Sequence, residues 1–69
     1  MNVERLVAMA NDIGHFFASE PDRAAAVAGI ATHIQRFWDP RMRRAIAAHA
    51  RQGGTGLEPL VREAVQSLL

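Results

Sequence analysis

Proline and glycine breaks divide this chain into four stretches whose apolar residues recur at helical spacing, and that pattern constrains the fold most. The breaks lie at Ser19–Asp22, Asp39–Pro40 and Gly53–Gly56. Between them, apolar residues fall at positions i, i+3, i+4 and i+7, the repeat of an amphipathic helix. No stretch alternates apolar and polar residues as a half-buried strand does. We therefore expect an all-α fold, a small bundle of three to four short helices.

Local signals place the ends of these helices. Asp39 and Pro40 form a typical start, with Asp as the N-cap and Pro at the first helical position. Gly53 and Gly54 mark a helix end, and either Ser19 or Asp22 caps the second helix. The predicted helices span about Asn2–Ala18, Asp22–Trp38, Pro40–Gln52, and Glu58 or Pro59 to Leu68.

Each predicted helix has an apolar stripe that should face the core. In the first helix the stripe is Val3, Leu6, Val7, Ala10, Ile13, Gly14 and Phe17. In the second it is Val27, Ile30, Ala31, Ile34, Phe37 and Trp38, and in the third Met42, Ala45, Ile46 and His49. In the fourth it is Leu60, Val61, Ala64, Val65 and Leu68, with Arg62, Glu63 and Gln66 outward.

The side of the second helix opposite its stripe carries small residues. These are Ala25, Ala28, Gly29 and Thr32. Either they allow another backbone to come close, or the alanines merely favour a helix. In the second case Gly29 is an unforced cost of about 1 kcal/mol.

The length of 69 residues allows one domain, spanning 1–69. A chain this short buries only about 60% of its unfolded surface. It has no cysteine, so disulfides cannot reinforce it. Small domains commonly rely instead on oligomerisation or on a larger partner. The sequence shows neither a signal peptide nor an apolar run long enough to cross a membrane, so we expect a cytoplasmic protein.

Two apolar residues widen the stripe of the first helix beyond what one core-facing side needs. Met9 and Phe16 flank Ile13, so about half the circumference is apolar. Either two neighbouring helices of the same bundle grip this helix, or Met9 and Phe16 form a second ridge for another chain. We therefore include both residues among the candidate partner-binding residues.

The segment Phe37–Arg44 concentrates aromatic and basic residues at the start of the third helix. Trp38 precedes the break, and Arg41, Arg43 and Arg44 crowd the first turn, where the helix dipole disfavours cations. All eight basic residues of the chain are Arg, a residue suited to interfaces; codon bias is the alternative explanation. Since Trp and Arg dominate interface hot spots, we predict that these four residues bind a partner, although Trp38 also fits a core position.

Residues capable of catalysis or of metal binding are scattered. No two of His15, His33 and His49 are three or four positions apart, so no helix face offers a paired ligand set. His49 lies on an apolar face, where a hydrogen-bonded core histidine is the commoner case. The serines have no neighbouring base, and Gly53–Gly56 lacks the Lys of a phosphate loop. We expect no catalytic, cofactor-binding or metal-binding residue in this chain.

Nucleic-acid binding and self-association are the rival interpretations from composition. The arginines of the third helix could meet phosphates. The net charge is only +1, however, and the carboxylates are expected to dilute any basic patch. A self-associating bundle, with a homodimer of the isolated chain, also fits the surplus apolar surface.

Three blocks of the sequence carry a resemblance to a known family: Leu6–Phe17, Ile30–Arg43 and Gly56–Ala64. The most specific part, His33–Arg43, reads His-Ile-Gln-Arg-Phe-Trp-Asp-Pro-Arg-Met-Arg. Together they resemble the delta subunit of cytoplasmic NAD-dependent formate dehydrogenases, over nearly the whole chain.

The resemblance implies a small non-catalytic subunit that docks on the large catalytic subunit for assembly or stability. In this family's complex, formate is oxidised to carbon dioxide and NAD is reduced. The resemblance also implies cofactors elsewhere in the complex, namely a molybdenum or tungsten bis-pterin guanine dinucleotide, iron–sulfur clusters, FMN and NAD. The expected partners are therefore the catalytic and electron-transfer subunits.

Overall fold

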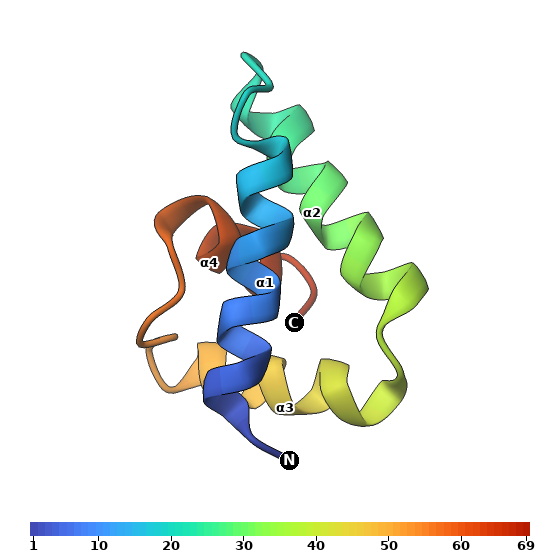
Figure 1. Ribbon diagram of the computed structural model, residues 1–69, viewed down its shortest axis with the longest axis vertical. Helices are drawn as coiled ribbons and strands as arrows, with labels where there is room; N and C mark the ends of the chain where they lie inside the picture. The colour runs from blue at the N-terminus through green and yellow to red at the C-terminus, as the bar shows by residue number, and fades with distance from the viewer.

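Four helices and no strands make up the chain in a computed structural model that describes all residues 1–69. The helices are α1 (Val3–Phe17), α2 (Arg23–Phe37), α3 (Pro40–Arg51) and α4 (Pro59–Gln66). In Figure 1, α1 and α2 form a hairpin, α3 crosses behind the first turns of α1 and below the end of α2, and α4 packs beside α1. The all-α prediction is confirmed, and the predicted helices extend only one or two residues past the observed ends.

Side-chain caps fix three of the four helix starts. The Oδ1 atoms of Asn2, Asp22 and Asp39 accept hydrogen bonds from Arg5 N, Ala24 N and Met42 N at 3.1, 3.0 and 3.0 Å. Asp22 rather than Ser19 therefore caps α2. Glu58 occupies the cap position of α4 without a side-chain hydrogen bond, and Pro59 is the first helical residue.

The predicted end of the third helix is a Schellman turn. Gly54 N donates to His49 O (3.0 Å) and Gly53 N to Ala50 O (3.1 Å). Gly53 has a φ of 106°, which side chains disfavour, so glycine is needed there.

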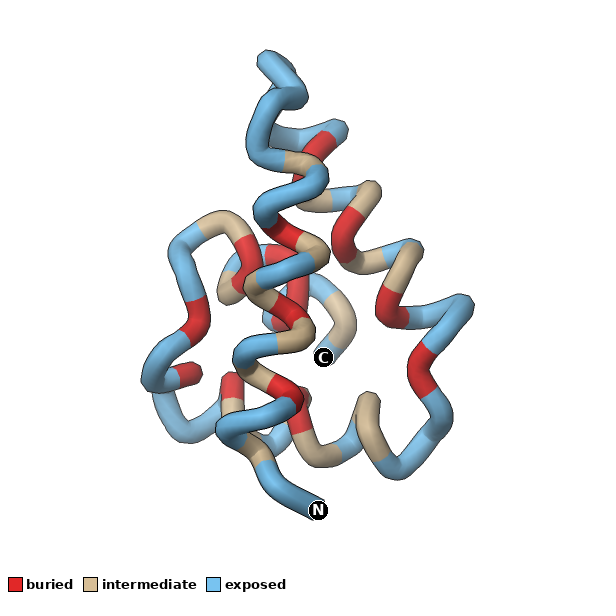
Figure 2. The backbone as a smooth tube through the Cα atoms, viewed as in Figure 1, coloured by how far each residue is buried: buried red, intermediate tan, exposed pale blue.

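The core gathers residues from all four helices and from one loop position. Figure 2 shows buried positions on the inward side of each helix. The short α4 contributes three of them, and packs against α2, α3 and α1. Leu57, in the loop before α4, is also buried. The main cluster consists of Leu6, Ala10, Ile30, Ile34, Trp38, Ile46, Ala50, Leu57, Val61, Ala64 and Val65.

The predicted stripe of the second helix is wrong at Phe37, whose exposed fraction is 71%. The buried line of α2 steps by four residues through Ala26, Ile30 and Ile34 and continues to Trp38. Trp38 has extended backbone angles, which end the helix, and its side chain takes the inward place. Phe37 is thereby left on the outer side of the last turn.

The outward assignment of Arg62 is also corrected, because the side chain is half-buried. Its Nη2 donates to Leu57 O at 3.2 Å, and its Nε is buried without a hydrogen-bond partner. Arg62 therefore packs beneath the loop that leads into α4.

Polar side chains fasten that loop to the helices. Asn11 Nδ2 donates to Gly56 O (3.0 Å), and Asn11 Oδ1 accepts from Glu58 N (3.1 Å). The His49 ring lies 2.7 Å from Thr55 O through Nε2. We name this arrangement the Asn11 clamp, and it holds the start of α4 against α1.

Candidate docking surface

A shallow groove between α1 and α2 is lined by aromatic and small residues. It consists of two adjoining hollows that share Phe17 and His33. We call it the aromatic groove and define it by its lining residues: Ile13, Phe16, Phe17, Ala28, Gly29, Thr32, His33, Arg36 and Phe37.

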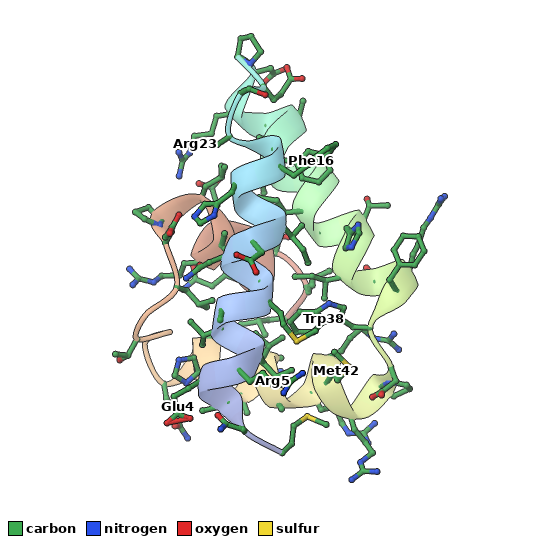
Figure 3. All side chains as sticks on the ribbon, in the orientation of Figure 1. Glu4, Arg5, Phe16, Arg23, Trp38 and Met42 are labelled. Carbon is green, nitrogen blue, oxygen red and sulfur yellow. The ribbon has the colours of Figure 1, made fainter.

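The α1 side of the groove presents two consecutive phenylalanines. Phe16 is 78% exposed, and Figure 3 shows it projecting from α1 toward α2. Its ring meets the ring of Phe17 edge to face, with centroids 5.1 Å apart and planes at 85°. The pair follows from adjacent positions on the last turn of α1, where Phe17 turns inward and Phe16 does not.

Phe17 lies directly over Gly29 of α2. A Cβ atom built on Gly29 would stand 2.7 Å from Phe17 Cδ1, closer than real carbon contacts allow. The ring of Phe17 therefore requires glycine at position 29. The close neighbour there is an aromatic side chain and not the backbone of another helix. The small size of Gly29 thus makes room for an aromatic side chain.

The α2 side of the groove ends in a second exposed aromatic, Phe37. Its ring packs on the imidazole of His33, with centroids 4.8 Å apart and planes tilted by 44°. The two residues are one turn apart, the spacing at which helix side chains meet. Arg36 lies on the same wall, and no carboxylate lines the groove.

Exposure of Phe16 and Phe37 leaves a large part of the chain's aromatic surface in water. Burial of a phenylalanine side chain contributes about 1.5–3 kcal/mol. Neighbouring exposed aromatics of this kind mark protein interaction sites. The groove is therefore the strongest candidate for a docking surface.

Charges are sorted along the fold. The part of the chain that holds α2 and α3, residues 23–51, carries six arginines and a single carboxylate, Asp39, which caps α3. The other six carboxylates lie outside it. Two of them form ion pairs at 3.0 Å, Glu58 with His15 and Glu63 with Arg23. The carboxylate of Glu63 thus answers one arginine of α2, and Asp39 is the one carboxylate within residues 23–51.

The three arginines at the start of α3 have different surroundings. Arg43 is half-buried, and its Nη1 donates to Trp38 O and, at 3.2 Å, to Gln35 O. Those carbonyls end α2, where the helix dipole favours a cation. Arg41 and Arg44 are exposed and form neither a hydrogen bond nor an ion pair within the chain. Only these two remain without a partner.

The predicted partner-binding residues thus fall into two groups. Phe16, Arg41 and Arg44 lie on the surface. Trp38 is 5% exposed and belongs to the core, and Met9 is half-buried against it. Trp38 thus takes the core position that the sequence also allowed, and Arg43 is half-buried like Met9. A part for any of the six in docking stays a prediction. The apolar stripe of the second helix assigns Phe37 to the core, so the sequence does not predict its place on this surface.

The histidines all have neighbours within the chain. The hydrogen bond from His15 Nε2 to Glu58 Oε2 (3.0 Å) and the charge of Glu58 raise the pKa of His15. Asp12, 3.9 Å from Nδ1, acts in the same direction. No group of three or more His, Cys, Asp or Glu side chains is arranged to hold a metal ion. No helix is long and apolar enough to span a bilayer.

Comparison with protein families gives a match over most of the chain. The family model described as NADH-dependent formate dehydrogenase delta subunit FdsD matches residues 5–65. That range includes all of α2 and α3 and nearly all of α1 and α4. Searches of curated proteins and of solved structures gave no match. The match therefore covers both the aromatic groove and the arginines of α3.

Proposed function

Because the chain belongs to the delta subunit family of NADH-dependent formate dehydrogenases, we propose that it is a non-catalytic accessory subunit of such a complex. It docks on the large catalytic subunit and supports the assembly or stability of the complex, in the cytoplasm. The complex oxidises formate to carbon dioxide and reduces NAD.

The aromatic groove is the observation that carries this proposal. Two of the three phenylalanines are more than two-thirds exposed, and both lie on this one surface. A subunit of a larger enzyme can leave such residues exposed because its partner covers them. Docking through the groove accounts for both at once.

The side chains of this chain suit a docking role better than a cofactor role. Iron–sulfur clusters are held mainly by cysteine thiolates, and the chain has no cysteine. Its acidic and histidine side chains do not gather into a metal-binding set. The lack of cysteine supports the proposal that this chain holds no iron–sulfur cluster. We assign the clusters and the molybdenum or tungsten cofactor, with FMN and NAD, to the other subunits.

Co-purification tests the proposal. The tagged chain is expressed with the formate dehydrogenase subunits, and the large subunit is expected to remain bound through washing. A chain carrying Phe16→Ala and Phe37→Ala should lose it. Leu69→Ala, which also truncates an exposed apolar residue, serves as the control and should retain it.

The two ways of failing have different meanings. If the wild-type chain does not retain the large subunit, the docking role is wrong. If the double variant retains it as well as the wild type does, the docking role stands and the groove is not the surface used.

A further inference from the structure

We propose that the aromatic groove binds an acidic amphipathic helix of the partner. Apolar side chains of that helix enter the two hollows, and its carboxylates face Arg36 together with Arg41 and Arg44 at the start of α3. The inference rests on the proposed docking function and names the chemistry of the segment that this surface takes.

The shape of the groove favours a helix. Two adjoining hollows that share Phe17 and His33 can receive two apolar side chains from one face of a helix, where residues three and four apart are neighbours. The exposed aromatic Phe16 of α1 lines one hollow, and the exposed aromatic Phe37 of α2 lines the other. A helix laid in such a groove buries both rings.

The charges around the groove favour an acidic partner. Arg36 lines one hollow and is exposed, without a hydrogen bond or ion pair in the chain. Arg41 follows Phe37 by four residues, so its Cα lies within about 15 Å of that of Phe37. Arg41 and Arg44 are likewise unpaired and exposed. No carboxylate lines the groove, so Arg36 is the one Arg, Lys, Asp or Glu side chain on its walls.

The same charges disfavour a second copy of this chain. In a two-fold dimer the same patch meets itself. Arg36 of one copy would then approach Arg36 of the other, and the two positive charges would repel each other. No carboxylate lines the groove of either copy to neutralise them. A partner segment of opposite charge has no such repulsion.

Two designed peptides test the inference on the full 69-residue chain. Both are helical and have Leu at the same i, i+3, i+4 and i+7 positions. One carries Glu at its polar positions and the other carries Lys. Binding is followed by chemical-shift changes in the isotope-labelled chain. The Glu peptide should shift residues of the groove and bind about tenfold more tightly than the Lys peptide, since each exposed ion pair contributes a few-fold.

Matched charge variants sharpen the test. R36E/R41E should abolish or reverse the preference for the Glu peptide. R5E/R51E changes the net charge equally, at exposed arginines near the start of α1 and at the end of α3, and should keep the preference.

Other outcomes overturn the inference. Equal binding of the two peptides, shifts outside the groove, or no binding of the Glu peptide would each do so. Tighter binding of a short DNA duplex than of the Glu peptide, at Arg36 and Arg41, would also overturn it. So would a molecular mass of the isolated chain that rises with concentration and no longer does so in F16A/F37A, because a second copy would then occupy the groove. If the chain prefers the Glu peptide but the large subunit does not co-purify, the proposed docking function is wrong. The inference that the groove binds an acidic helix is then still supported.

Discussion

At the scale of single residues, Arg43 does more for the fold than its place in the sequence suggests. A cation in the first turn of α3 is unfavourable for that helix. Its guanidinium, however, reaches back to Gln35 O and Trp38 O at the end of α2. The same side chain therefore closes one helix and ties it to the next.

Removal of this side chain should weaken the fold. We expect Arg43→Ala to lower the free energy of unfolding by about 1–2 kcal/mol, because two carbonyls lose a charged donor. Arg44→Ala, at an exposed position without a partner, should change it by less than about 0.5 kcal/mol. Urea denaturation measures both, and equal effects would contradict the capping role.

The pair of His15 and Glu58 makes stability depend on pH. Since the pKa of His15 is raised in the folded chain, the pair stabilises fully below the unfolded pKa of histidine. That contribution is lost as pH rises through the raised value. An NMR titration should show the pKa of His15 moving down toward its usual value in Glu58→Gln. Glu63→Gln, which breaks the exposed pair with Arg23, is the control and should leave the titration of His15 unchanged.

At the scale of elements, the contact between α1 and α2 depends on one missing side chain. Phe17 occupies the space where Gly29 has no Cβ. Phe17 and Gly29 both line the aromatic groove. Their contact therefore influences both the spacing of α1 and α2 and the shape of the groove.

Gly29→Ala should therefore change the groove more than the stability. The half-buried ring of Phe17 can swing away, and alanine gains about 1 kcal/mol of helix propensity. The free energy of unfolding should change by less than about 1 kcal/mol, while NOEs from the Phe17 ring to α2 should weaken. Thr32→Ala, also on the groove wall, should leave those NOEs intact. Unchanged NOEs in Gly29→Ala would show that Phe17 does not determine the residue at this position.

Helix ends were predictable from sequence, whereas the surroundings of several side chains were not. Asp39, Pro40 and Gly53 act on neighbouring backbone, so short-range chemistry suffices. Phe37 and Trp38 both fit the apolar stripe, and only the exit of the chain from α2 decides which one is buried. Asn11 acts on residues 45 and 47 positions away, and no local pattern signals that clamp. A mid-helix asparagine, a poor helix former, is the one available hint.

At the scale of the whole molecule, the core and the proposed docking surface use different residues. Val65 is fully buried, while Phe16 and Phe37 project into solvent. A chain of this size has a small free energy of unfolding, about 3–10 kcal/mol. Truncation of one core side chain therefore removes a large fraction of this free energy, whereas truncation of exposed side chains removes little.

Core variants should consequently reduce the stability of the chain, whereas variants of the exposed aromatics should mainly reduce binding of the large subunit. Val65→Ala should lower the free energy of unfolding by about 2 kcal/mol. The double variant F16A/F37A should lower it by about 1 kcal/mol or less, the worth of the edge-to-face ring pair, yet lose the large subunit. Denaturation curves and co-purification of the same samples make the comparison. A double variant that unfolds as readily as Val65→Ala would mean that these rings belong to the core.

The uneven distribution of charge over the chain also affects the rate at which it associates with a partner. A chain with a net charge of only +1 has little overall attraction for a distant acidic surface. Residues 23–51 nevertheless hold six arginines and one carboxylate, Asp39, whereas the rest of the chain holds two arginines and six carboxylates. An acidic surface orients a molecule with such an uneven charge during approach, so that α2 and α3 face it and more encounters succeed. Added salt shortens the range of this orientation and slows association even where the final contact is apolar.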